Sequence, residues 1–115
     1  MAAVDTRKRS SSLSETTTAG AVRVKLIGVL GSAAGRREIN LEWSEPLTLS
    51  ELLGNLLKKV DNHQFQDFLI DSGTNDPRPN VIILLNERDC NLFDGLKTRI
   101  EKGITVTIIP VAHGG

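Results

Sequence analysis

The chain has 115 residues, 39% of them hydrophobic, which suits one small domain with a single core. Fourteen basic and fourteen acidic residues cancel, and no apolar run approaches the roughly 20 residues that span a bilayer, so neither direct nucleic-acid binding nor a membrane is favoured. The single cysteine, Cys90, excludes an intramolecular disulfide and a multi-cysteine zinc site, and it is typical of the reducing cytoplasm.

Residues 1–20 are rich in serine and threonine and almost free of large apolar side chains. Such a segment cannot bury enough surface to offset the entropy of ordering it. We therefore predict a disordered leader over 1–20, with a localisation signal at Arg7, Lys8 and Arg9 as the alternative to a merely solubilising role. The folded domain is expected to span 21–110.

The first part of the domain has the pattern of two strands. Apolar and polar residues alternate over 22–26 and again over 38–43, and Pro46 ends the second run. The glycine-containing stretch 31–35 lies between them and predicts a turn.

A helix follows, and its start is marked by a capping box. Thr48 and Glu51 are three residues apart, so each side chain can bind a backbone N–H that the first turn leaves unpaired. The repeat of apolar residues predicts one continuous stripe that packs onto a sheet: Leu49, Leu52, Leu53, Leu56, Leu57 and Val60. The shorter repeat of Phe65, Phe68 and Leu69 predicts one or two further helical turns.

The second half of the chain alternates loops and strands. Residues 71–79 read as a loop, and five consecutive apolar residues over 81–85 are typical of an inner strand covered on both faces. Residues 86–89 predict a turn and 90–93 a very short strand. Because one core cannot take every side chain of the run 81–85, alternate members should instead join an exposed apolar patch that includes Ile109 or Ile27.

The end of the chain is its most informative feature. The alternation over 104–109 predicts a final strand, and Pro110, which lacks an N–H, should weaken its pairing. Residues 111–115 are then expected to form a flexible tail that reaches roughly 16 Å. Gly114 and Gly115 lack side chains and could pass through a narrow slot in another protein, so the terminal carboxylate itself is the candidate functional group.

Little in the sequence supports catalysis or metal binding by the chain itself. A nucleophile would need a neighbouring base, yet the two histidines are His63 and His113. His63 is expected just after the helix, either facing solvent or complementing the dipole at the helix C-terminus, and His113 lies in the tail. Cys90 is expected to be a buried, inert thiol. The stretch 31–35 lacks the strand-to-helix context and the lysine of a phosphate-binding loop. We therefore predict no catalytic residue, no bound metal and no bound cofactor.

The order of elements and the last residues together resemble the ubiquitin-like superfamily. The chain is most similar to the ubiquitin-related modifiers, the small archaeal modifiers and the bacterial sulfur carriers MoaD and ThiS, over about residues 22–115. Cys90 stands where the modifier group often has tryptophan, and the leader of about 20 residues is additional. The residues that carry the resemblance are the run from Val81 to Asp89, then Leu92 and Leu96, and the closing His113, Gly114 and Gly115.

This resemblance implies an α+β fold of the β-grasp type, with a mixed four- to five-stranded sheet packed on one main helix. It implies that an E1-like enzyme uses ATP to adenylate the carboxylate of Gly115, with Gly114 and His113 as the threading segment. A sulfur donor would then give a thiocarboxylate that serves a tRNA-thiolation enzyme, or a lysine of a target protein would form an isopeptide bond. The alternatives are a MoaD-like small subunit of molybdopterin synthase and a ubiquitin-like binding module that does not conjugate.

Overall fold

The computed structural model describes residues 19–44 and 46–111, and its framework is one mixed sheet. The strand order is β2-β1-β5-β3-β4; β1 and β5 are parallel, and the other neighbouring pairs are antiparallel. The sheet confirms the predicted architecture and places the last strand at its centre. The strands are β1 (Ala19–Leu26), β2 (Glu38–Ser44), β3 (Val81–Leu85), β4 (Arg88–Asp89) and β5 (Thr105–Pro110).

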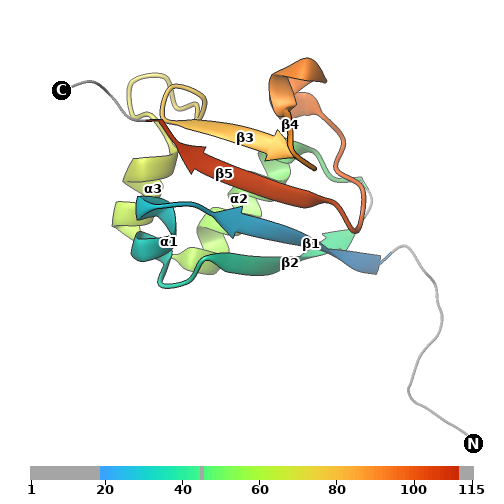
Figure 1. The fold of residues 1–115 in the computed structure, drawn as a ribbon, viewed down its shortest axis with the longest axis horizontal. Coiled ribbons are helices and arrows are strands. Elements are labelled where there is room, and N and C mark those ends of the chain that lie inside the picture. The colour runs from blue at the N-terminus through green and yellow to red at the C-terminus, as the bar shows by residue number, and fades with distance from the viewer. Residues whose placement is uncertain (1–18, 45, 112–115) are drawn as a thin grey trace, which may run out of the picture.

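Helices cover one face of this sheet, and the core lies between the two layers (Figure 1). α2 is the main helix, as the sequence predicts, and α3 follows it after two residues. The helical elements are α1 (Val29–Ala34), α2 (Leu49–Val60), α3 (His63–Leu69) and the 3-10 turns η1 (Cys90–Leu92) and η2 (Gly95–Lys97). The fold is therefore α+β.

The predicted capping box starts α2. The backbone N–H of Glu51 donates to Thr48 Oγ1 at 3.2 Å, and the N–H of Thr48 donates to Glu51 Oε1 at 2.9 Å. Of the predicted stripe, Leu57 and Val60 are half-buried at the edge of the core. The fully covered members are Leu49, Leu52, Leu53 and Leu56.

Replacing the capping hydroxyl should weaken the fold by a measurable amount. Thr48→Ala leaves the N–H of Glu51 without its capping partner, so the free energy of unfolding should fall by about 1 kcal/mol. Urea unfolding measures this change. Ser50→Ala is the matched control, because Ser50 is exposed on the same first turn. An equal loss in both variants would contradict a capping role for Thr48.

The prediction of a turn over 31–35 is wrong, because most of that stretch belongs to α1. Leu30 is fully buried and anchors this short helix in the core. Gly31 packs where a Cβ atom would lie 2.9 Å from the carbonyl oxygen of Leu26. Gly35, at φ 81°, ends the helix in the left-handed conformation. The two glycines thus serve close packing and termination, two uses that the sequence alone does not distinguish from a turn.

The short strand predicted over 90–93 is also wrong. Asn86 and Glu87 both have positive φ, at 48° and 74°, so a two-residue turn closes the hairpin and β4 begins at once with Arg88. The carboxylate of Asp89 then accepts a hydrogen bond from the N–H of Asn91 at 2.8 Å. This cap starts η1 where a strand was expected.

Candidate functional site

The described chain ends beside the centre of the sheet. β5 lies between β1 and β3, and its last residue, Pro110, is paired in register with Val81. One residue further, the N–H of Val111 donates to the carbonyl oxygen of Asn80 at 2.9 Å. Val111 is therefore fixed to the domain, although the sequence predicts that the tail begins there. His113, Gly114 and Gly115 lie outside the described residues, which end one residue beyond Pro110.

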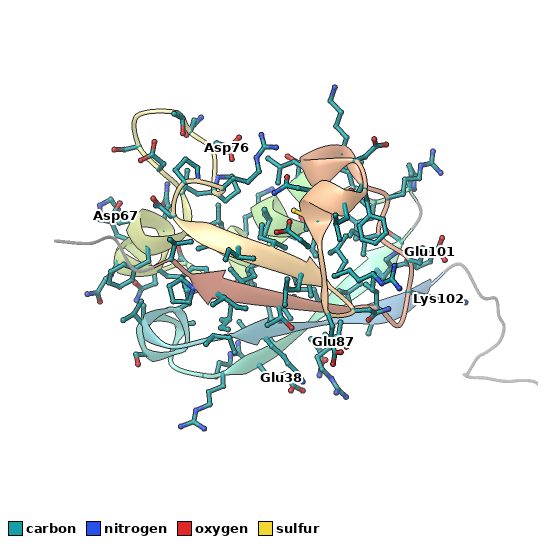
Figure 2. The ribbon with its side chains drawn as sticks, turned by 45° about the horizontal axis from the view of Figure 1, so that its top comes forward. Glu38, Asp67, Asp76, Glu87, Glu101 and Lys102 are labelled. Atoms are coloured by element: carbon teal, nitrogen blue, oxygen red, sulfur yellow. The ribbon has the colours of Figure 1, made fainter. Side chains whose placement is uncertain are left out.

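The loop that supplies this anchor is held by its own carboxylates. Asp71 Oδ2 accepts from the N–H of Thr74 at 2.9 Å, and Asp76 Oδ2 binds Arg78 Nη2 at 2.7 Å (Figure 2). The hydrogen bond from the Arg78 side chain lowers the pKa of Asp76 below its ordinary value. These contacts confirm the loop predicted over 71–79 and lead the chain into Asn80.

The outer face of the sheet carries an apolar patch at this point, which we call the exit patch. It consists of Ile27, Ile82, Ile109 and Val111. Ile82 and Ile109 are register partners, and Ile27 follows the pairing of Leu26 with Ile108. Ile27 and Ile82 each keep 43% of their surface exposed. Large apolar side chains gathered on one face in this way are typical of an interaction site.

The exit patch tests two expectations for the strand over 81–85: that it is covered on both faces, and that its alternate side chains are exposed. Val81, Ile83 and Leu85 are buried, whereas Ile82 points away from the helices. The strand is thus interior in the sheet but covered on one face, so the expectation of cover on both faces is wrong. The expectation that alternate members join Ile109 and Ile27 outside is confirmed.

A basic hollow borders the exit patch on the side of β1. It lies between the end of β1, α1 and the segment before β2, and Lys25, Arg36 and Arg37 contribute to its lining. Glu38 also lines it and is bound to Arg23 at 3.3 Å, where both side chains are about half exposed. The hollow beside the exit patch therefore has more cationic than anionic side chains in its lining, although the net charge of the whole chain is zero.

The other candidate groups do not form a reactive set. His63 Nε2 lies 3.5 Å from Asp67 Oδ2 in an exposed pair on α3, which confirms the prediction that His63 faces solvent. Among residues 19–44 and 46–111, no group of His, Cys, Asp and Glu side chains is placed to hold a metal ion. No helix within those ranges is long and apolar enough to cross a bilayer.

Cys90 is buried, as predicted, with 1% of its surface exposed. Burial raises the pKa of its thiol, and the neighbouring carboxylate of Asp89 adds to the rise. Less thiolate is then present at neutral pH than for a free cysteine, and the thiolate is the reactive form. The native chain should therefore react with an aromatic disulfide reagent at pH 8 far more slowly than the chain in 8 M urea, as followed by absorbance. Equal rates in the two conditions would contradict an inert Cys90.

Comparison with known proteins agrees with this architecture. A model of the ThiS family matches residues 24–115. The chain belongs to the ThiS family. The match spans most of the chain and includes the last three residues of β1 and the whole of β2, β3, β4 and β5. It also includes the terminal glycines, which the described coordinates do not reach.

Individual relatives of this ThiS-family chain are similar over nearly their whole length. Ubiquitin-related modifier 1 of Schizosaccharomyces pombe is 26% identical over 98 residues, which cover 83% of this chain and 99% of the relative. The solution structure of Urm1 from Trypanosoma brucei superposes with a TM-score of 0.67 at 25% identity, covering 87% of this chain and 100% of that one. Small archaeal modifier protein 1 of Methanosarcina acetivorans gives a TM-score of 0.70 at 24% identity over 84% and 98% of the two chains. The chain is thus a ubiquitin-like protein of the sulfur-carrier and modifier class.

Sequence reasoning missed part of the site. Val111 was assigned to the tail, and the carbonyl of Asn80 that holds it has no signature in the sequence. Gly28, at φ 59°, turns the chain away beside Pro110, and a Cβ atom there would lie 3.5 Å from the proline ring. In the sequence, Gly28 follows an alternating strand and precedes Val29. A glycine at such a position predicts a sharp change of chain direction.

Proposed function

We propose that the terminal carboxylate of Gly115 is the reacting group of this chain, and that an E1-like adenylating enzyme activates it with ATP. The chain is then substrate and carrier, and the catalytic groups belong to its partners. His113 and Gly114 form the segment that enters the partner's active site. The observation that carries the proposal is the position of Val111. The chain leaves the sheet there, from the central strand and beside the exit patch, four residues before the carboxylate.

The chemistry explains why activation is needed. A free carboxylate is a poor electrophile, whereas an acyl-adenylate carries AMP as a good leaving group. A carboxylate oxygen of Gly115 attacks the α-phosphorus of ATP, and pyrophosphate departs. A sulfur donor then replaces AMP to give a thiocarboxylate for a tRNA-thiolation enzyme, or the amine of a target lysine replaces it to give an isopeptide bond.

The exit patch is the proposed docking face for the activating enzyme. An extended segment of four residues reaches at most about 14 Å, so the enzyme's active site must lie close to Val111. A partner that covers the exit patch satisfies this limit and removes the exposed parts of Ile27 and Ile82 from water. We place this exchange in the cytoplasm, where the lone cysteine remains reduced.

Intact-mass spectrometry tests the proposal and separates it from its alternatives. The full chain is incubated with its E1-like enzyme, ATP and a sulfur donor. A mass gain equal to sulfur minus oxygen supports the carrier role, and higher-mass species that vanish when ATP is omitted support conjugation. Thiocarboxylate formation only inside a stable complex with a larger subunit would favour the molybdopterin-synthase alternative. An unchanged mass would contradict the proposal and favour the alternative of a ubiquitin-like binding module that does not conjugate.

A further inference from the structure

A second groove lies at the other end of β3 from Val111, and the proposed function does not use it. Its lining includes the apolar Leu85 and Ile104, the basic Arg88 and Arg99, and Phe93 from the segment after η1. No carboxylate contributes to the lining. We call this feature the arginine groove.

The two guanidinium groups of the arginine groove are available to a ligand. Neither Arg88 nor Arg99 forms an ion pair with another described residue. Asp89, one of the two acidic neighbours of Arg88 in the sequence, accepts a hydrogen bond from the N–H of Asn91. Glu87 and Glu101 occupy the neighbouring loops in Figure 2, but neither lines the groove. The groove therefore presents two guanidinium groups with no carboxylate in its lining.

The same region exposes two large apolar side chains. Phe93 keeps 49% of its surface exposed, and Leu92, one residue earlier, keeps 73%. Arginine beside an exposed aromatic ring is the composition that dominates binding energy at protein interfaces. The arginine groove can thus offer an apolar contact as well as charge.

The backbone around the groove is fixed before any ligand binds. Asn86 Oδ1 accepts from the N–H of Thr105 at 2.9 Å, which ties the hairpin to β5. Thr98 Oγ1 donates to the carbonyl of Gly95 at 2.7 Å, and the carbonyl of Thr98 accepts from the N–H of Leu49 at 2.9 Å. A rigid site loses little conformational entropy on binding.

We propose that the arginine groove binds an acidic peptide segment that carries an aliphatic or aromatic anchor. The carboxylates of the peptide pair with Arg88 and Arg99, and its anchor packs against Phe93. A nucleic-acid backbone fits less well, because two cations do not make a track for successive phosphates. The four-residue rise from Val81 to Leu85 is about 13 Å, so the groove remains open while the tail is engaged elsewhere.

Titration of the isotope-labelled full chain with the acetylated octapeptide DELFDELE tests the proposal. Saturable amide shifts are expected at Arg88, Phe93 and Arg99, and the neutral peptide NQLFNQLQ should bind about tenfold more weakly. The double variant Arg88→Gln, Arg99→Gln should weaken binding of the acidic peptide about five- to tenfold. Phe93→Ser should weaken it about threefold or more.

The matched control changes the same charge at a distant place. Arg36→Gln with Arg37→Gln should leave the peptide affinity within twofold, and thermal unfolding of each variant verifies its fold. An equal loss in this control pair would reduce the effect to unspecific attraction and overturn the proposal. So would an absence of saturable shifts up to about 1 mM peptide, or a stronger response to oligouridylate than to DELFDELE.

Discussion

With the E1-like enzyme, ATP and a sulfur donor, a chain that ends at His113 is expected to release no AMP, although its domain unfolds at the same temperature as that of the full chain. Removing Gly114 and Gly115 draws the carboxylate back by about 7 Å. A displacement of even 1 Å can lower the rate of an oriented reaction roughly a hundredfold, so the loss should be complete within detection. In the truncated chain, the imidazole of His113 would also have to enter the narrow part of the partner's active site, which the two glycines of the full chain occupy without a side chain.

AMP release and calorimetry measure the two halves of this prediction. Gly114→Ala keeps the length of the chain and serves as the control, with activity expected between those of the truncated and full chains. AMP formation by the truncated chain at the full rate would mean that the reacting group lies elsewhere. A lower unfolding temperature would instead show that the last two residues belong to the folded domain.

Ile82→Asp is expected to raise the concentration of this chain at which the activating enzyme is half-saturated by about thirtyfold. The substitution places a carboxylate within the exit patch, on the β3 side of Ile109, where docking would remove its water without supplying a partner. Loss of a side chain that dominates the binding energy of an interface costs about 2 kcal/mol or more. Because Ile82 faces away from the core and is 43% exposed, the fold itself should survive the change.

Asn40→Asp is the matched control for this experiment. Asn40 is exposed on β2 at the far side of β1, and the substitution adds the same charge to the same sheet. Steady-state AMP formation at varied concentrations of each variant gives the comparison. Equal effects of Ile82→Asp and Asn40→Asp would assign the loss to charge and contradict docking through the exit patch.

The main elements were predictable because each has a local signal. The capping box of Thr48 and Glu51 marks the start of α2, and two-residue alternation marks β1, β2 and β5. The whole apolar run of β3 marked a strand but did not reveal which side chains face out. That parity depends on pairing with β5, where Ile82 meets Ile109, and pairing is a property of the assembled sheet.

The errors occur where tertiary contacts decide local structure. Gly31 lies within α1, where the carbonyl oxygen of Leu26 leaves no room for a side chain, and no local pattern reports that approach. The turn expected over 86–89 is confined to Asn86 and Glu87, both with positive φ, and β4 begins at Arg88. The arginine groove brings together Arg88 and Arg99, which are eleven residues apart, and no local pattern predicts that they share a site.

Isotope transfer from the last residue tests the central claim most directly. The full chain, labelled with oxygen-18 in its C-terminal carboxylate, is incubated with the E1-like enzyme, unlabelled ATP and a sulfur donor. If that carboxylate attacks the α-phosphorus, the bridging oxygen leaves with AMP, so mass spectrometry should find one oxygen-18 atom in each AMP released. AMP that forms at the same rate but carries no label would contradict activation of Gly115.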